Sequence, residues 1–138
     1  MPLNLELINL LVTCLMIGVI WMVQLVHYPS FSYIEPAKFL DFHQHHSQSI
    51  SMIVLPLMVI ELGLAAYLCW FNNFQISYLL PLILVILLWM STFFIQVPLH
   101  QKLGVEMNVQ QITKLVQTNW IRTILWTGKG IWLAWIFR

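Results

Sequence analysis

The chain has 138 residues, of which 60% are hydrophobic and 8% are charged. Soluble domains are about 45–50% apolar and about 25% charged, so this composition excludes both an ordinary soluble domain and a disordered chain. Six Lys and Arg against five Asp and Glu leave a net charge of +1, which provides no basic surface for a nucleic acid. The size fits a single domain whose surface faces lipid rather than water.

Four apolar stretches follow one another along the chain, at about residues 5–27, 47–70, 77–97 and 117–137. A helix crosses a bilayer with about 20 mostly apolar residues, so each stretch is long enough to be a span. The stretches predict an all-α protein, an integral membrane four-helix bundle with antiparallel up-down-up-down topology and a single domain over residues 1–138. The N-terminus lacks the basic region of a signal peptide, so we expect the first span to be retained.

Two helices are expected to begin before their apolar stretches. Glu35-Pro36 predicts the start of a helix that leads into the second span, because proline is favoured in the first turn. Asn108, with Gln111 three residues later, is close to a capping-box pattern and predicts the start of the helix entering the fourth span.

The charges of the links predict the orientation of the bundle. The longer links and the start of the fourth span hold Lys38, Lys102, Lys114 and Arg122, whereas the link at residues 71–75 holds no charge. Positively charged links favour the cytoplasmic side, so we expect both longer links in the cytoplasm and both termini outside. The expected location is the cell (inner) membrane, with the lipid bilayer as a partner.

All five histidines fall at one end of the expected bundle, because antiparallel spans bring the end of one helix beside the start of the next. They are His27 at the end of the first span, His43, His45 and His46 before the second, and His100 at the end of the third. His45 faces away from its two neighbours, so we expect it to face solvent. The other four are expected to converge on the cytoplasmic side.

Other polar residues accompany these histidines at helical spacing. Residues three or four apart share one helix face, and unpaired polar groups are costly in a membrane, so such stripes turn toward one another or toward water. The alternative for each residue is a side chain that only bonds interfacial water. The stripes are Trp21, Gln24 and His27 in the first span, Gln96 and His100 in the third, and Asn119, Arg122 and Trp126 in the fourth. They predict a polar pocket, in which Trp21, Gln24, Gln96 and Trp126 are the candidates for contacting a bound cofactor or substrate.

His27, His43, His46 and His100 are the candidate metal ligands. Neutral imidazole binds iron, copper or zinc, especially where several rings meet at one level of a bundle. A haem held by two histidines, such as His27 with His100 or His46, is an alternative, because one ligand from each facing helix is enough. A pocket without any cofactor is the third alternative.

Glu61 and Lys129 are the other charges expected inside the bundle, near the middle of their spans. A salt bridge between them is the favoured interpretation, since an unpaired charge is costly in a bilayer. The alternative is a proton relay that also uses His43, which would share a helix face with Glu61 about 27 Å away, as calculated from the helix rise.

Two motifs in the C-terminal third resemble those of a known family. One is Gln96-Val97-Pro98-Leu99-His100-Gln101-Lys102-Leu103, and the other is Thr118-Asn119-Trp120-Ile121-Arg122-Thr123. They are similar to the paired motifs of the anthrone-oxygenase-like family of small four-span membrane proteins. That family has an Asn-Val-Pro-Leu-Asn-like stretch at the end of its third span and an Asn- or His-x-x-Arg-Thr stretch at the start of its fourth. This chain departs from the pattern in Gln96 and His100, where the family commonly has Asn, and in the histidines at residues 43–46.

The resemblance implies a membrane oxygenase or oxidase-like site in which His100, Asn119 and Arg122 surround the substrate. Oxidation of an anthrone needs a base that forms the phenolate or carbanion, and groups that hold the developing oxyanion. By their chemistry, Arg122 would stabilise the negative charge, Asn119 and Gln96 would orient a carbonyl, and one of the histidines would be the base. We therefore expect an oxidoreductase that acts on a lipid-soluble aromatic or quinone-like compound, with or without a metal.

Two other classes of function stay open. The protein could be a non-enzymatic accessory or assembly subunit of a larger membrane complex, whose histidines bind a metal or haem or are merely interfacial. A homo-oligomer is an alternative assembly. The protein could also be a small transporter of protons or metal ions that uses Glu61, Lys129 and the histidines. Partner chains that co-purify would favour the first class, and an ion flux that stops in Glu61→Gln would favour the second.

Overall fold

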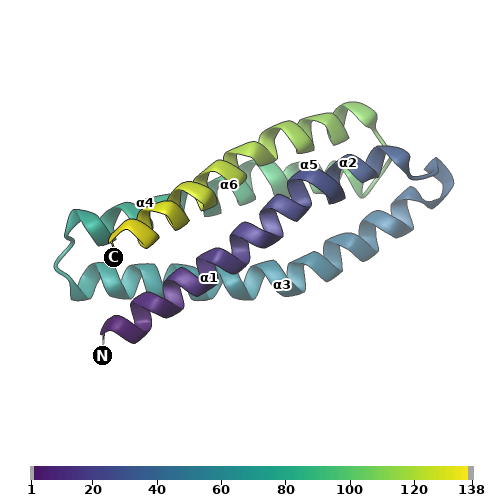
Figure 1. The fold of residues 1–138 in the computed structure, drawn as a ribbon. Coiled ribbons are helices and arrows are strands. Elements are labelled where there is room, and N and C mark those ends of the chain that lie inside the picture. Colours follow the sequence, from purple (N-terminus) through teal and green to yellow (C-terminus); the bar gives the residue numbers. More distant parts are fainter. Residues whose placement is uncertain (1, 137–138) are drawn as a thin grey trace.

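The computed structural model describes residues 2–136, which form long helices joined by short links (Figure 1). No strand is present in this part of the chain. Several helical segments continue directly into the next one and so form four long helical units. We call these units the first to fourth rods, and they span residues 2–33, 36–71, 76–103 and 109–136. In chain order the segments are α1 (Pro2–Met22), η1 (Val23–His27), α2 (Tyr28–Ser30), η2 (Phe31–Tyr33), α3 (Pro36–Phe71), α4 (Ile76–Ser91), η3 (Thr92–Gln96), α5 (Val97–Leu103) and α6 (Val109–Ile136).

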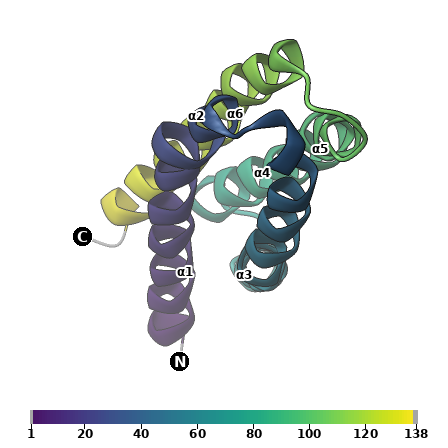
Figure 2. The same ribbon diagram turned by 90° about the vertical axis from the view of Figure 1, so that its right-hand side faces the viewer.

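The four rods run alternately up and down, as the four apolar stretches predict. Figure 1 shows the α3–α4 link at the same end as both ends of the chain, and the other two links at the opposite end. α1 packs against α3 and α6, and α4 packs against the same two helices. Figure 2 shows the segment after α2 crossing over the end of the bundle to reach α3. The predicted all-α four-helix bundle is confirmed.

Three of the described helices are long and apolar enough to cross a membrane, namely Leu5–Tyr33, Pro36–Phe71 and Ile76–Leu103. α6, which contains most of the expected fourth span, is not one of them, and residue 137 of that span lies outside the described residues. Arg122 and Lys129 make α6 more polar, yet both side chains are buried in the bundle. These two charged residues of α6 thus face its neighbours, and a membrane crossing by α6 stays a prediction.

Both predicted helix starts are confirmed. α3 begins at Pro36 and continues to Phe71, so the histidine segment and the second span form one helix. The backbone N–H of Gln111 donates to Asn108 Oδ1 at 3.1 Å, as a capping side chain requires, and α6 begins at Val109.

Two π-helical turns, η1 and η3, interrupt the first and third rods. Each ends two residues before a proline, Pro29 after η1 and Pro98 after η3. Proline has no N–H to donate to the carbonyl four residues earlier, and its ring collides with that carbonyl. A π turn contains one extra residue and so separates the two groups. The prolines therefore explain why both rods widen here, at the turns that hold Gln24 and Gln96.

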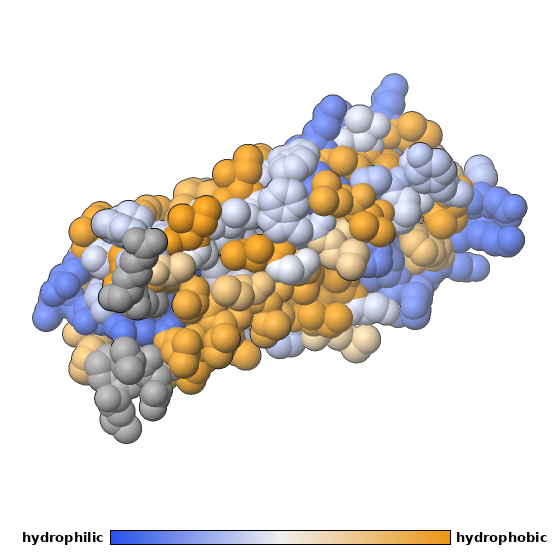
Figure 3. All heavy atoms as spheres, in the orientation of Figure 1, coloured by the Kyte–Doolittle hydropathy of each residue, from blue (hydrophilic) through white to orange (hydrophobic). Residues whose placement is uncertain are grey.

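The surface of the bundle is apolar along its length and polar at its ends. On the face shown in Figure 3, hydrophobic residues cover the middle and hydrophilic residues gather at the two ends. α3 has 36 residues. At about 1.5 Å per residue it is longer than a hydrocarbon core of about 30 Å, so one end of α3 extends toward water. Lys38 and Asp41 are exposed at its N-terminal end, which indicates that the histidines of α3 lie near the membrane surface.

Candidate functional site

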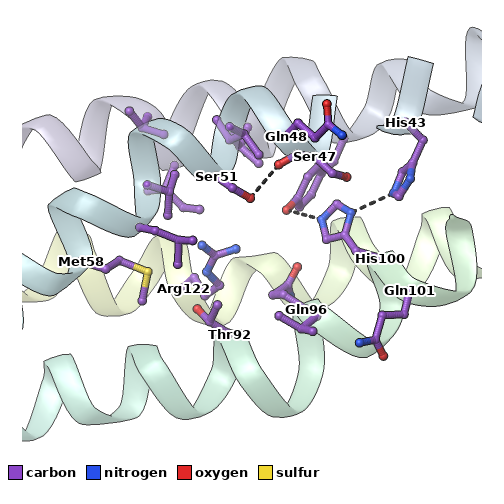
Figure 4. Close-up of a pocket in the computed structure, with 18 of the residues that line it drawn as sticks. His43, Ser47, Gln48, Ser51, Met58, Thr92, Gln96, His100, Gln101 and Arg122 are labelled. Atoms are coloured by element: carbon purple, nitrogen blue, oxygen red, sulfur yellow. Dashed lines mark hydrogen bonds between the residues drawn. The ribbon is translucent and has the colours of Figure 1, made fainter. Parts of the chain in front are cut away.

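A cavity of about 720 Å³ lies at the histidine end of the bundle. Its walls come mainly from α1 and α2, from α3, and from η3 and α5, and α6 contributes Arg122 (Figure 4). Small-molecule sites have volumes of roughly 300–1,000 Å³, so a ligand of ordinary metabolite size would fit.

The wall that α3 supplies changes from polar to apolar along the helix. Its polar part is made of Gln44, Ser47, Gln48 and Ser51, and its apolar part of Val54 and Met58. Gln44, Gln48 and Ser51 are exposed, so the polar part lies at the mouth of the cavity. Met16 and Ile20 of α1 are buried and complete the apolar end. The cavity therefore suits a ligand with one polar and one apolar end.

Three side chains from three helices form a hydrogen-bonded chain on the cavity wall. His100 of α5 is in the middle, with its Nε2 3.0 Å from the hydroxyl oxygen of Tyr28 and its Nδ1 3.0 Å from Nε2 of His43 (Figure 4). All three residues line the cavity. A neutral imidazole has one donor and one acceptor nitrogen, so a proton taken up at one end of the chain can be matched by a proton released at the other. We call this set the Tyr28–His100–His43 chain.

His46 and His27 lie beside this chain, behind the cavity wall. The ring centroids are 5.4 Å apart for His27 and His46, and 6.3 Å apart for His46 and His100. His46 is buried, and its Nε2 has no hydrogen-bond partner among the described residues. The four histidines thus come together as the topology predicts, and His45 is exposed, also as predicted.

These four rings are not arranged as a set of metal ligands. Within residues 2–136, no group of three or more His, Cys, Asp or Glu side chains could hold a metal ion. The hydrogen bond between His43 and His100 directs one nitrogen of each ring at the other, so those two nitrogens do not face a common ion. Binding of iron, copper, zinc or haem at these histidines stays a prediction.

Arg122 is the charged residue that reaches the cavity from α6. Its side chain is buried, with 5% of the residue exposed. Nη1 donates to Asn119 Oδ1 at 3.3 Å, and the guanidinium carbon lies 5.2 Å from the ring centroid of Trp126. Nε is buried without a hydrogen-bond partner in the described part of the chain. Asn119, Arg122 and Trp126 therefore share one buried face of α6, as their spacing predicts.

Gln24 connects the π turn η1 to α6. Its Oε1 accepts hydrogen bonds from Asn119 Nδ2 at 2.9 Å and from the Thr123 hydroxyl at 3.3 Å. Its Nε2 donates to the backbone carbonyl of Val116 at 3.1 Å. Neither Gln24 nor Asn119 lines the cavity. Gln24 instead orients Asn119, whose carbonyl oxygen in turn accepts from Arg122.

Of the three remaining predicted residues, Gln96 lies on the cavity wall, whereas Trp21 and Trp126 lie away from it. Gln96 lines the cavity, and its buried Oε1 has no partner among the described residues. Trp21 is 37% exposed and donates to the Thr127 hydroxyl at 3.1 Å. Trp126 is buried and donates to Glu61 Oε2 at 2.9 Å. The two tryptophans thus pack the bundle around the site without touching the cavity.

Two features of the cavity were not identified from the sequence. Tyr28 follows the last residue of the Trp21 stripe, and the π turn before Pro29 brings it to the inner face. The polar wall of α3 is the second feature. Gln44, Ser47, Gln48 and Ser51 are spaced by three, one and three residues, so the spacing rule used for the other helices would have found them.

The predicted salt bridge between Glu61 and Lys129 is confirmed, in a second polar cluster away from the cavity. Lys129 Nζ lies 2.6 Å from Glu61 Oε1, and both side chains are buried. The Thr13 hydroxyl accepts from Lys129 at 2.9 Å and also lies 3.1 Å from Glu61 Oε1. Lys129 also donates to Asn9 Oδ1 at 3.4 Å. Since these partners hold both charges, the cluster is a structural link between α1, α3 and α6.

No protein-family model matches the chain, and no curated protein or solved structure matches it. The fold and the site define a class: a four-helix bundle in which three of the described helices are long and apolar enough to cross a membrane, with a cavity of mixed polarity at one end. The side chains on the cavity wall are therefore the basis for the function proposed below.

Proposed function

We propose that the protein is a membrane oxidoreductase, of an oxygenase-like type, that acts on a lipid-soluble aromatic or quinone-like compound in the cavity. The observation that carries the proposal is the Tyr28–His100–His43 chain on the wall of the same cavity as the buried Arg122. A base and a cation that face one small cavity are the groups needed to remove a proton and hold the resulting anion. The resemblance of the motifs that contain His100 and Arg122 to the anthrone-oxygenase-like family supports the same reaction class.

The Tyr28–His100–His43 chain accepts the proton of the substrate. His100 is hydrogen-bonded at both ring nitrogens, so uptake of a proton on the Tyr28 side is matched by transfer to His43 on the other side. His43 belongs to the end of α3 that carries the exposed Lys38 and Asp41, so the proton has a short path to water. Tyr28 and His100 are then the catalytic residues that touch the substrate, and His43 passes the proton on.

Arg122 stabilises the anion that the proton transfer leaves behind. Its guanidinium has unused donors and lies in a low-dielectric interior, where interaction with an oxyanion is strongest. Gln96 contributes a free carbonyl oxygen, which accepts a hydrogen bond from a substrate hydroxyl. Asn119 is a positioning residue, because it contacts Arg122 and not the cavity.

Molecular oxygen is the oxidant in this proposal. The substrate anion gives up its electrons to oxygen, so the chain need only form the anion and exclude water. For a ring CH₂ group, two C–H bonds break, one oxygen atom forms the new carbonyl group, and the other leaves as water. The four electrons lost by the carbon are those gained by O₂, and the two protons pass to the water.

The cavity mouth fits a substrate that enters from lipid. Phe93 is 53% exposed and Val97 is 36% exposed, and both line the cavity on the side of η3 and α5. The polar part of the α3 wall faces the same opening. An aromatic compound that partitions into the interface would meet an apolar rim on one side and hydrogen-bonding groups on the other.

Oxygen consumption by the purified protein in lipid nanodiscs tests the proposal. The probes are anthrone and a hydroquinone with a decyl side chain, one for each substrate type. We expect protein-dependent oxygen uptake with at least one probe. Anthrone should give one anthraquinone and one water per O₂, and the hydroquinone, which loses two electrons and two protons, should give one quinone and one hydrogen peroxide per O₂. Uptake no faster than in empty nanodiscs with both probes would overturn the proposal.

A further inference from the structure

We propose that the cavity selects ligands that already carry one ionised oxygen group, attached to an apolar body and held against Arg122. This inference rests on the proposed function only in taking the cavity as a ligand site. It does not require that the ligand be oxidised there.

The buried charges of the described residues do not balance. Among the described residues, the buried side chains with permanent charges are Glu61, Arg122 and Lys129. Glu61 and Lys129 neutralise one another at 2.6 Å. One positive charge, that of Arg122, is left inside the bundle without a counter-ion. An isolated charge in a low-dielectric interior is strongly unfavourable, so a counter-ion from outside the chain would stabilise it.

The surroundings of Arg122, in the described part of the chain, contain no counter-ion. No carboxylate in the described part of the chain lies within salt-bridge distance of its guanidinium. The titratable groups near it are Tyr28 and His100, which are not anionic in their ordinary states at neutral pH. Its contacts are hydrogen bonds to Asn119 and to the neutral Tyr28 hydroxyl, and the face of Trp126. The guanidinium therefore has donors left over, and its Nε has none of the partners that a buried N–H needs.

The cavity is the place where such a counter-ion can bind beside Arg122. Arg122 lines the cavity, and Figure 4 shows it between the α3 wall and the η3 wall that carries Gln96. A guanidinium binds planar oxyanions such as carboxylates and delocalised enolates through parallel N–H donors. Beyond Arg122 the wall is apolar, with Met16, Ile20 and Met58. The ligand therefore combines an oxyanion with an apolar body.

Two kinds of molecule have this chemistry. One is an ionised aromatic, such as a hydroxyquinone, which resembles the anion that the proposed proton transfer would form. The other is a long-chain carboxylate from the membrane. Both place a single delocalised negative charge beside Arg122 and an apolar body beside Met58.

Equilibrium binding to the protein in nanodiscs, measured by isothermal titration calorimetry without oxygen, tests the proposal. The aromatic pair of probes is 2-hydroxy-1,4-naphthoquinone, which is ionised at neutral pH, and its neutral 2-methoxy analogue. The lipid pair is dodecanoate and methyl dodecanoate. Empty nanodiscs give the correction for partitioning into lipid. The variants are Arg122→Gln, which removes the charge, and Arg122→Lys, which keeps it.

The matched control is Lys114→Gln, because Lys114 is an exposed cation on the same helix. We expect the anionic member of at least one pair to bind about tenfold or more tightly than its neutral partner. Arg122→Gln should reduce that ratio to about one, while Arg122→Lys and Lys114→Gln should keep most of it. The pair that shows the preference identifies the ligand as aromatic or as a lipid carboxylate.

Equal binding of anionic and neutral probes by the wild-type protein would overturn the inference, whether or not Arg122→Gln folds. A preference that survives in folded Arg122→Gln would overturn it as well. A clear anion preference without any oxygen uptake would leave this inference standing and contradict the proposed function alone.

Discussion

The salt bridge between Lys129 and Glu61 joins α6 to α3 inside the bundle. Each charge has further partners, with Trp126 donating to Glu61 Oε2 at 2.9 Å and Thr13 accepting from Lys129 at 2.9 Å. In a buried ion pair, the attraction between the two charges offsets the cost of removing each from water. If one charge is removed, the other keeps its full desolvation cost with nothing to offset it. The effect of a substitution should therefore depend on whether the partner is removed as well.

Glu61→Leu should lower the free energy of unfolding by about 3–5 kcal/mol, because it leaves the Lys129 ammonium buried without a counter-ion. The double variant Glu61→Leu with Lys129→Met should recover most of that loss, since neither charge of the pair is then left buried without the other. Equilibrium unfolding in mixed micelles with increasing SDS measures both. The control is Glu35→Ala, in the exposed pair with Lys38, which should change the free energy by at most about 1 kcal/mol. Equal losses in the single and double variants would show that the pair itself is not what matters.

Sequence reasoning identified the residues of the site better than their roles. The spacing of Asn119, Arg122 and Trp126 correctly predicted one buried face, because α6 is a regular helix over that range. The same rule applied to Trp21, Gln24 and His27 was less accurate, because the helix widens in η1 and only Gln24 is fully turned inward. Spacing shows which residues share a face, but not which of them reaches a cavity.

At the scale of elements, the two π turns distinguish the first and third rods from ordinary transmembrane helices. Both occur before a proline, and both contain a glutamine that turns toward α6, Gln24 in η1 and Gln96 in η3. The number of helices and the helix starts at Pro36 and after Asn108 could be predicted from the sequence, whereas the first and third rods run past their predicted ends, to Tyr33 and Leu103. The π turns could not be predicted, because a proline is compatible with a kink, a helix end or a widened turn, and packing selects among them.

Deleting Leu25 from η1 should leave the protein folded but less stable, because removal of the extra residue of a π turn keeps the two halves of the rod in register and leaves a kink at Pro29. Deleting Leu15 should prevent folding, because it rotates the preceding part of α1 by about 100° and takes Thr13 away from Glu61. The two leucines are matched in exposure, at 59% and 58%. Size-exclusion chromatography and thermal melting in detergent compare the two variants. Similar behaviour of both deletions would contradict the assignment of η1 as an inserted residue.

At the scale of the whole molecule, the arrangement of the links predicts how the bundle sits in the membrane. The α3–α4 link and the two ends of the chain lie at one end, and the two links beside the histidines lie at the other (Figure 1). Up-down topology could be predicted from sequence, because four apolar stretches with short links leave few alternatives. The orientation toward the cytoplasm depends on Lys38, Lys102 and Lys114 and is still a prediction.

Cysteine labelling tests this orientation. In a background with Cys14 and Cys69 replaced by alanine, Gln75→Cys should react with a membrane-impermeant maleimide added to intact cells, because the α3–α4 link is expected outside. Glu106→Cys, in the α5–α6 link, should react only after the cells are opened. Both residues are exposed. The opposite pattern would reverse the orientation, and labelling of both from one side would contradict the up-down arrangement in the membrane.

The central claim is that the Tyr28–His100–His43 chain performs acid–base chemistry on a ligand in the cavity. The most direct measurement is the rate of oxygen uptake, with the more active of the two probes, in His100→Gln and Tyr28→Phe. Each has a matched control on an exposed residue of the same type, His45→Gln and Tyr33→Phe, and Tyr33 is 86% exposed. We predict that His100→Gln and Tyr28→Phe lower the rate by roughly 10²–10⁴-fold, while the two control variants retain the wild-type rate. Wild-type rates in folded His100→Gln and Tyr28→Phe would contradict the claim.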